Sequence, residues 1–467
     1  MTSTNGTLEQ VLDACAANRE RDLDDLIRLL RQPSISAQNV GVTECADLVR
    51  DFLADVGFNA RLYPTAGHPM VVGDHLHVPG APTLLIYGHY DVQPPDPLDA
   101  WISPPFEPTM RNGKLFARGA GDNKGQFFAQ LAGIRAWLQT TGELPINVKF
   151  LVEGEEEVGS PHLESFVAEH RELLSADLVY TSDGPVFDNA HPQVVFGVRG
   201  MLYVELRAHG ARHDLHSGNW GGVAPNPAWA LVRLLNTMLD PDNLVMVEGF
   251  YDDVSPVTPL MRTVMDRIPI DQAKTLGGLG IAQLPPPRNL PYFDRLMARP
   301  TMNIAGFTSG YGGPGSKTVL PSTAVVKMDM RLVPDQRPAD IWTKVEAHVR
   351  RHAPDVAVSH LGSMDPSFTP LDHPYAHAVR RAVERGFGRA PIDVPLLGGS
   401  LPDATWTKTL GLPSFVVPYA NSDEDNHAPN ENLVVERFFS GVRTAAALLA
   451  ELASTGRRAP RRDSSPK

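Results

Sequence analysis

Apolar residues recur along this chain with two different spacings, and these spacings predict its strands and helices. The uninterrupted apolar run at 84–86 is typical of a strand buried on both faces of a parallel sheet, although periodicity alone also fits a buried helix segment. Further strands are predicted near 60–63, 146–152, 176–181 and 413–418. Helical spacing predicts helices over about 7–30 (one long or two abutting), 42–56, 374–386 and 431–452, and a further helix leads on from the segment 119–126 to about Trp137. These segments together predict an α/β domain with a mostly parallel sheet.

The pattern changes near Val198. Residues 201–208 alternate between apolar and polar, and 324–332 places Val326, Met328, Met330 and Leu332 on one face, as in half-solvated antiparallel strands. Helices are predicted over 227–238, 338–351 and, within the proline-rich stretch 241–300, over 260–276; a further strand is predicted near Val356. We therefore predict a catalytic domain over 1–197 and 372–467, with an α+β (ferredoxin-like) domain inserted at 198–371.

Composition limits the classes of function. A length of 467 residues predicts two or more domains, and 42% apolar with 21% charged residues is ordinary for a soluble protein. A membrane span or a signal peptide is not expected, because no run of eighteen apolar residues occurs and the first ten residues are polar. The net charge of −12 argues against nucleic acid as a partner, and the basic residues of 455–467 read as a solvated tail. Only Cys15 and Cys45 occur, which favours a reducing cytoplasm.

Polar side chains stand where the predicted strands end or the helices begin. Each has a simple structural explanation, such as a strand-end pair, a helix N-cap or a solvated acidic loop. The glycines of 119–125 match neither a dinucleotide fingerprint nor a Walker sequence, and Asp122 would repel phosphate. Ligands gather at the carboxyl ends of parallel strands, so one sheet edge could bring these side chains together. They are His89, Asp91, Asp122, Glu156, Glu157, Asp183 and His427.

Two imidazoles and several carboxylates suit Zn²⁺, with Mn²⁺ or Co²⁺ as alternatives. The set is too large for one tetrahedral ion and is about right for two ions that share a carboxylate. Two ions ~3.5–4 Å apart form a recurrent hydrolytic device. The sequence therefore predicts a dinuclear metal centre.

The chain resembles the M20 metallopeptidases, in particular the carnosinase-like cytosolic dipeptidases. The matching segments occur in family order and span nearly the whole chain. They are Gly88-His-Tyr-Asp-Val-Gln-Pro94, Arg118-Gly-Ala-Gly-Asp122-Asn-Lys-Gly125, Glu153-Gly-Glu-Glu-Glu-Val-Gly-Ser160, Ser182-Asp183, Asp214-Leu-His216-Ser-Gly218, Lys317-Thr-Val-Leu-Pro321, Arg331-Leu-Val-Pro334 and His427-Ala-Pro-Asn-Glu431.

The resemblance implies a ligand set for two Zn²⁺ ions per subunit. His89 and Asp183 would hold one ion, Glu157 and His427 the other, and Asp122 would bridge them. Asp91 would orient His89, and Glu156 would be the general base, a role worth roughly 10²–10⁴-fold. Glu153 and Glu155 would then lie outside the metal sphere.

The resemblance also implies a homodimer whose inserted domain serves in dimerisation or as a lid. His216 of one subunit would stabilise the oxyanion in the partner's site; the alternative is that it caps its own loop. Arg331, with Thr318 and Ser400, would receive the terminal carboxylate of the substrate, and Asn303 is a weaker candidate for that pocket.

Three features depart from the family pattern. Asn123 replaces a second Asp at a position that is usually structural, while Pro402-Asp403 and the run Pro285-Pro-Pro287 would reshape the substrate pocket. The predicted function is dinuclear hydrolysis of the amide bond of dipeptides or short peptides that have a free C-terminal carboxylate. An N-acyl-amino-acid deacylase of the same family is the alternative. A metal-binding protein without turnover would need neither Glu156 nor His216.

Overall fold

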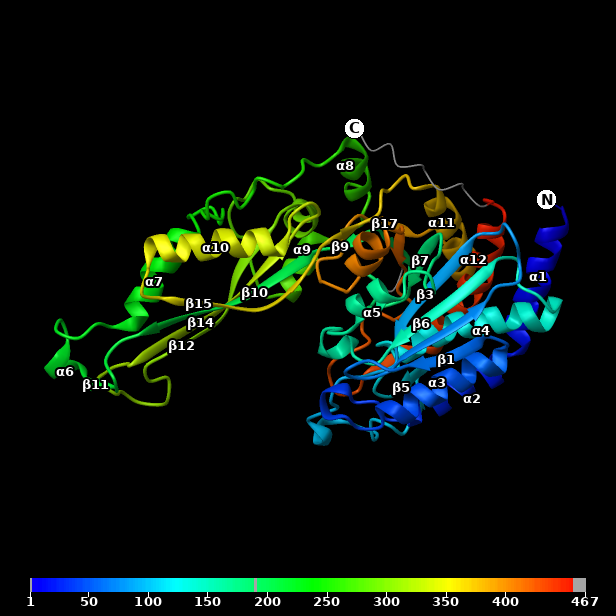
Figure 1. Cartoon of the computed structure of the whole chain (residues 1–467), viewed down its shortest axis with the longest axis horizontal. Coiled ribbons are helices and arrows are strands. Elements are labelled where there is room, and N and C mark those ends of the chain that lie inside the picture. Colours follow the sequence, from blue (N-terminus) through cyan, green and yellow to red (C-terminus); the bar gives the residue numbers. More distant parts are fainter. Residues whose placement is uncertain (1, 189–190, 457–467) are drawn as a thin grey trace. The chain divides into compact units, whose positions relative to one another are not determined.

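The computed structural model describes residues 2–188 and 191–456, which fold into two compact units (Figure 1). The first unit takes the chain up to Phe196, then Thr369–Val394 and the chain from Thr405 on. The second unit takes Gly197–Phe368 and Pro395–Ala404. The segment Pro395–Ala404, which the sequence places in the catalytic domain, thus packs with the second unit.

The first unit is built on an eight-stranded sheet. Its middle strands pair in parallel (β6 with β3, β3 with β7, β7 with β18), as does the edge pair β8 and β17, while the remaining neighbours are antiparallel. The predicted α/β class with a mostly parallel sheet is confirmed. In spatial order the strands are β1 (Asn59–Tyr63), β2 (Met70–His75), β6 (Asn147–Glu153), β3 (Thr83–His89), β7 (Leu178–Thr181), β18 (Ser414–Val416), β8 (Gln193–Val195) and β17 (Ile392–Val394).

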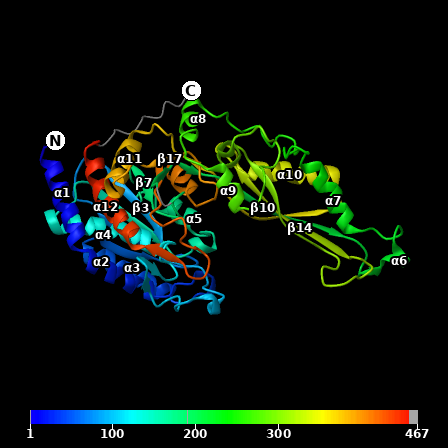
Figure 2. The same ribbon diagram turned by 180° about the vertical axis from the view of Figure 1, so that it is seen from behind.

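Helices cover both faces of this sheet, so every residue of β3 is buried. On one face, Leu85 and Tyr87 pack with Phe166 of α5 (Leu163–Glu169) and with Trp406. The other face carries α3 (Val42–Val56) and α4 (Lys124–Thr141), with α12 (Val435–Ala453) packed on α4, as Figure 2 shows from behind. The remaining helices of this unit are α1 (Thr2–Ala17), α2 (Arg19–Arg31) and α11 (Pro374–Phe387).

The second unit has the order β-α-β-β-α-β and a four-stranded antiparallel sheet, which is a ferredoxin-like arrangement. In spatial order the strands are β12 (Thr301–Ser309), β14 (Thr323–Leu332), β10 (Gly200–His209) and β15 (Ala357–Met364). Helices α7 (Pro227–Met238) and α10 (Pro338–His352) pack on it, and Val326, Met328, Met330 and Leu332 enter the shared core as the alternation predicts.

Short elements complete the two units. In the first, β19 (Asn432–Val434), β5 (Lys114–Phe116) and β4 (Thr109–Arg111) form a small sheet. In the second, β9 (Gly197–Val198) pairs with β16 (Ser367–Phe368), and β11 (Leu215–His216) pairs with β13 (Val319–Leu320) ahead of α6 (Ser217–Trp220). The single helix predicted at 260–276 is wrong: α8 (Pro259–Met265) and α9 (Gln272–Gly278) flank Pro269, which cannot continue a helix.

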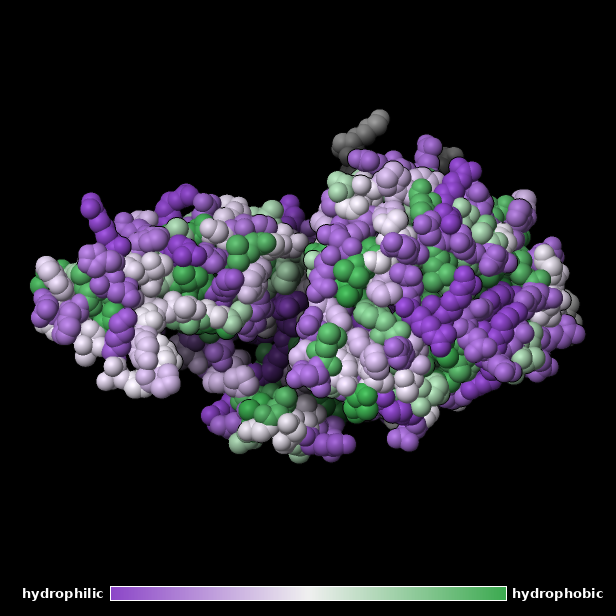
Figure 3. Space-filling model, turned by 90° about the horizontal axis from the view of Figure 1, so that it is seen from below, coloured by the Kyte–Doolittle hydropathy of each residue, from purple (hydrophilic) through white to green (hydrophobic). Residues whose placement is uncertain are grey.

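Within the described residues, no helix combines the length and the apolar character needed to cross a bilayer. The face shown in Figure 3 carries mostly hydrophilic side chains, with apolar residues scattered between them.

Candidate metal centre

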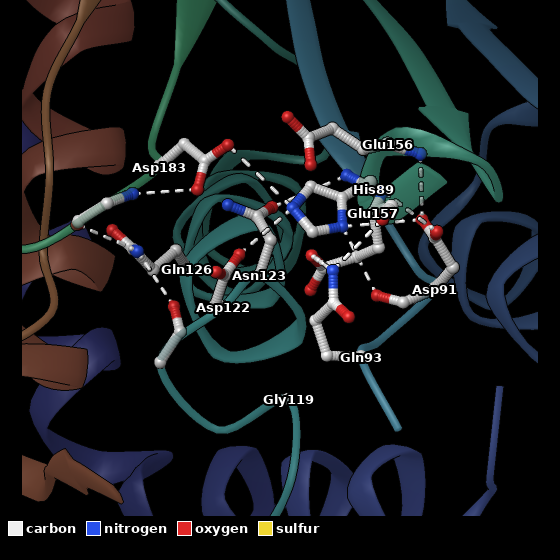
Figure 4. Close-up of polar contacts among 12 residues, drawn as sticks. His89, Asp91, Gln93, Gly119, Asp122, Asn123, Gln126, Glu156, Glu157 and Asp183 are labelled. Carbon is white, nitrogen blue, oxygen red and sulfur yellow. Dashed lines mark hydrogen bonds and ion pairs between the residues drawn. The ribbon is translucent and has the colours of Figure 1, made fainter. Parts of the chain in front are cut away.

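The ends of three neighbouring strands place the predicted ligands together in the first unit. His89 ends β3, Asp183 lies two residues after β7, and Glu157 sits on the short helical turn Glu156–Val158 that follows β6. Asp122 lies two residues before α4 begins, and His427 belongs to the loop between β18 and β19. In Figure 4, His89 lies between Asp183 and Asp91, with Asp122 on the side of the glycine-containing loop.

Two groups of three ligands share one carboxylate. Asp122 Oδ1 lies 3.1 Å from His89 Nε2, which is also 3.7 Å from Asp183 Oδ2. Asp122 Oδ2 lies 3.1 Å from His427 Nε2, which is 3.2 Å from Glu157 Oε2. Within each group the potential ligand atoms lie within 4.8 Å of one another. The two oxygens of Asp122 thus face different groups, as a bridging carboxylate requires.

The nitrogen and oxygen atoms of this centre are better satisfied by metal ions than by hydrogen bonds alone. His89 is fully buried, yet its Nε2 makes no hydrogen bond of acceptable geometry to any described residue. A buried imidazole nitrogen without a hydrogen bond is unfavourable unless another partner takes its lone pair. Each group offers one imidazole and two carboxylates, which suits Zn²⁺, Mn²⁺ or Co²⁺.

The carboxylates and imidazoles of this centre shift one another's pKa values. Interactions with Asp122 and Glu157 raise the pKa of His427 to about 10. Burial lowers the pKa of His89, but the Asp122 and Asp91 carboxylates outweigh it, and the pKa ends well above its ordinary value. Burial likewise acts to raise the pKa of Asp122, but the two imidazoles outweigh it and hold that pKa below its usual range.

Two further carboxyl groups have raised pKa values. Burial and then the charge of Asp122 raise the pKa of Asp183 to about 7. Burial, assisted by the charges of Asp183 and Asp122, raises the pKa of Glu156 well above its usual range. Both shifts have the same cause, because like charges and desolvation both favour the protonated form of a carboxyl group.

Asp91 fixes both the ligand His89 and the turn that carries Glu156 and Glu157. It is fully buried, and its Oδ1 lies 3.4 Å from His89 Nδ1. Its two oxygens accept hydrogen bonds from the backbone N–H groups of Glu156 (3.2 Å) and Glu157 (3.1 Å). Glu157 Oε2 also accepts from the Gln93 side chain at 3.0 Å, and Figure 4 shows the Glu156 and Glu157 side chains diverging.

The other two glutamates of the acidic run lie away from the ligand groups. Glu153 is buried and accepts hydrogen bonds from Tyr87 Oη (2.5 Å) and Ser160 Oγ (2.9 Å). Glu155 contacts the His162 ring, with 2.7 Å between Oε2 and Nδ1. Both glutamates therefore shape the turn instead of facing the ligands.

Two amide side chains connect the ligand loops, and the sequence analysis singles out only one of them, Asn123. Gln126 Nε2 donates to the carbonyls of Gly121 (2.8 Å) and Gly184 (3.1 Å), which neighbour Asp122 and Asp183. Asn123 Nδ2 donates to the Ser182 carbonyl at 2.5 Å. An aspartate carboxylate could not donate to Ser182, so Asn123 suits a structural position. No motif spacing signals these contacts, because they join segments about 60 residues apart.

The predicted substrate residues form two separate groups in the second unit. Arg331 Nη1 donates to Ser400 Oγ at 2.8 Å, and Asn303 donates to Asp329, which lies 3.5 Å from Arg331 Nε. Ser400 joins this group through the segment Pro395–Ala404. Ser367 Oγ donates to buried Asp403, so the Pro402-Asp403 departure anchors the same segment.

His216 and Thr318 form the second group. Thr318 Oγ1 lies 3.5 Å from His216 Nε2, and His216 Nδ1 accepts the Gly218 N–H at 3.0 Å, so the ring does cap its own loop. This group is tied to the start of β14 through β13, whereas Arg331 is near the end of β14. Arg331 lies eight positions after Thr323 along β14, which corresponds to a distance of roughly 26 Å. Within one chain, Thr318 therefore does not join Arg331 and Ser400.

Comparison with known proteins identifies the family of this chain. Residues 85–451 match the family model described as peptidase family M20/M25/M40. The Beta-Ala-His dipeptidase of Homo sapiens is 30% identical over 82% of this chain and 78% of its own length. The Cys-Gly metallodipeptidase of Schizosaccharomyces pombe is 28% identical over 96% of this chain and 99% of its own length.

Solved structures agree in fold as well. An M20 family metallo-carboxypeptidase from Sulfolobus solfataricus is 34% identical, with a TM-score of 0.85 over 93% of this chain and 99% of that one. Human carnosine dipeptidase 1 is 26% identical, with a TM-score of 0.79 over 96% of this chain and 99% of that one. The predicted family is thereby confirmed. The chain belongs to peptidase family M20/M25/M40 and is a hydrolase of the metallopeptidase class.

Proposed function

We propose that this protein is a dinuclear metal-dependent dipeptidase that cleaves the amide bond of dipeptides or short peptides with a free C-terminal carboxylate. One observation carries the proposal: two ligand groups share Asp122, and the half-buried Glu156 carboxyl feels the charge of that shared carboxylate. Curated relatives aligned over most of the chain are named as dipeptidases, which supports the substrate class.

His89 and Asp183 would hold one ion, Glu157 and His427 the other, and Asp122 would bridge them. Two Zn²⁺ ions suit this set, and Mn²⁺ and Co²⁺ accept the same ligands. When bound, such a pair polarises a carbonyl and lowers the pKa of a water molecule to about 7.

Glu156 is the general base in this proposal. Burial and the neighbouring carboxylates raise its pKa, and positive charge held by the ligand groups would favour the ionised form that catalysis needs. The ionised carboxylate takes a proton from water and later passes it to the leaving amine. Asp91 positions Glu156 by accepting its backbone N–H.

The substrate carboxylate binds to Arg331 and Ser400, because a guanidinium can pair with a carboxylate through two parallel hydrogen bonds. His216 donates from Nε2 to the oxyanion. Its Nδ1 accepts the Gly218 N–H, so the neutral ring carries its proton on the exposed Nε2.

The separation of the two substrate groups supports a homodimer in which one copy supplies His216 and Thr318 to the site of the other. The second unit then serves as the dimerisation or lid domain. A cytoplasmic location fits the two free, buried cysteines, Cys15 and Cys45.

The test is a turnover assay on Zn²⁺-loaded protein with dipeptides, the same dipeptides amidated at the C-terminus, and N-acetyl amino acids. We expect turnover of free dipeptides and at least a tenfold lower kcat/KM for the amidated forms. Preferred turnover of N-acetyl amino acids would assign the deacylase function instead. Mixing His216→Ala with Glu156→Gln protein should restore activity, and no recovery despite subunit exchange would refute the shared site.

A further inference from the structure

The loop that carries Asp122 is held by a buried carboxylate from a distant part of the chain. Glu431, just before β19, is buried. Its Oε1 accepts hydrogen bonds from the backbone N–H groups of Gly121 (3.0 Å) and Asp122 (3.1 Å). Its Oε2 accepts from the Gly119 N–H (3.0 Å) and from Arg118 Nη1 (2.8 Å). The proposed chemistry does not use this carboxylate, so its role needs another explanation.

Three backbone N–H groups within four residues converge on Glu431, which makes the loop an anion-binding nest with its anion supplied by the chain itself. Gly119 has φ +86°, a conformation that glycine adopts without strain. The carbonyl side of the same loop is held by Gln126, which donates to Gly121. The backbone of the Asp122 loop is thus fixed by its N–H groups as well as by a carbonyl.

Arg118 orients the Glu431 carboxylate by donating to its Oε2 at 2.8 Å, and its positive charge favours the ionised form. The guanidinium is buried and also donates to the Pro94 carbonyl at 3.3 Å. Burial acts to raise the pKa of Glu431, and Arg118 is the main influence that opposes it. Loss of the Glu431 charge would therefore weaken the bonds to the loop, because charge-assisted hydrogen bonds are about twice as strong as neutral ones.

We propose that Glu431 is a positioning residue for the metal centre: it holds the Gly119–Asp122 backbone so that the two oxygens of Asp122 face the two ligand groups, and Arg118 orients it. The inference rests on the proposed metal-binding role of Asp122. It predicts that Glu431 contributes to metal affinity although its own oxygens face the loop backbone and Arg118.

A merely structural ion pair would behave differently, and the chain offers a matched control. Glu451 of α12 is also buried, and it pairs with Arg381 and Arg385. Its carboxylate accepts hydrogen bonds from both guanidinium groups, so Glu451→Gln removes a buried charge without touching the Asp122 loop.

The experiment titrates full-length metal-free protein with Zn²⁺ in competition with a chromogenic chelator, for wild type, Glu431→Gln and Glu451→Gln. We expect Glu431→Gln to bind Zn²⁺ 10–100-fold more weakly, because substitution of a residue that supports a metal ligand typically lowers metal affinity by that factor. Glu451→Gln should stay within twofold of wild type, even if both variants lose thermal stability. Equal affinity of Glu431→Gln and wild type would overturn the proposal.

If Glu431→Gln fails to fold, two further measurements still test the proposal. The double variant Arg118→Met with Glu431→Gln leaves no unpaired buried charge, and it should recover stability while Zn²⁺ affinity stays low. Amide hydrogen exchange in metal-free wild type should show protected N–H groups at Gly119, Gly121 and Asp122; rapid exchange there would overturn the proposal without any metal. Wild-type protein that binds no Zn²⁺ but shows these protected amides would refute the metal centre and leave the loop clamp intact.

Discussion

Asp91→Asn gives the sharpest test of how the centre is organised. The carboxylate accepts two backbone N–H groups, one per oxygen, from the consecutive residues Glu156 and Glu157. An asparagine keeps only one acceptor oxygen, so one N–H loses its partner and faces an NH₂ group. Leaving one buried donor unpaired costs about 1–3 kcal/mol. We therefore expect the free energy of unfolding to fall by about 1–3 kcal/mol.

The same substitution should damage the site beyond this loss of stability. The turn that shifts carries both the proposed base, Glu156, and the ligand Glu157, and a misplacement of ~1 Å can cost ~10²-fold in rate. Asp91 also approaches His89 Nδ1, and loss of such a supporting carboxylate lowers metal affinity by roughly 10–100-fold. We expect kcat/KM at saturating Zn²⁺ to fall by about two orders of magnitude, with weaker Zn²⁺ binding.

The assay measures kcat/KM for a dipeptide, Zn²⁺ affinity by chelator competition, and stability by urea unfolding. Asp177→Asn is a matched control, since Asp177 Oδ2 accepts the Thr83 N–H at 2.8 Å at the opposite end of β3. The control should lose stability but keep Zn²⁺ affinity within twofold. If Asp91→Asn retains both kcat/KM and Zn²⁺ affinity, the positioning of this turn by Asp91 is refuted.

Three further predictions follow from single contacts. Glu156→Gln should lower kcat by ~10²–10⁴-fold while elemental analysis still finds two ions per chain; intact turnover would reject the base. In metal-free protein His427 should titrate near pH 10 by NMR. Its folded pKa lies above its unfolded one, so its stabilising contribution is complete below pH 6.5 and lost as pH rises through 10. His427→Gln should remove that dependence, and an unchanged stability profile would contradict it. Gly121→Ala should lower the melting temperature and Zn²⁺ affinity, because the added Cβ would lie 2.0 Å from Oε2 of buried Glu424. Gly277→Ala, which meets nothing within 4 Å, should change neither.

The sequence predicts those elements that a short stretch of residues specifies on its own. The run at 84–86 became the buried strand β3, and α3 occupies Val42–Val56, closed by Gly57 at φ +110°. The sequence analysis does not predict several strands, and two of these, β2 and β12, contain residues that disfavour strands. The β2 segment contains Gly73 and Asp74, and β12 carries Gly306 at an irregularity in its pairing. The helix expected from Glu431 begins at Val435 instead, because Asn432–Val434 pairs with β5.

The ligand types and their order were predictable from motifs, but their supporting contacts were not. Arg118 and Glu431 lie 313 positions apart, so no spacing rule could link them. The sequence analysis assigns Thr318 and Arg331 to the same substrate pocket because both belong to motifs of the family. Most of the length of β14 lies between them, and the order of motifs along the chain does not reveal this distance.

Proton release is expected to accompany metal binding at this centre, because several of its groups have raised pKa values. Two imidazoles with raised pKa values and the raised carboxyls of Asp183 and Glu156 keep protons that a cation would displace, because metal ligands must be deprotonated. Affinity for Zn²⁺ should therefore rise with pH across the neutral range, with protons released on binding. The carboxylates crowded around Asp122 account for both effects, because they raise the pKa values of the two imidazoles and also attract divalent cations.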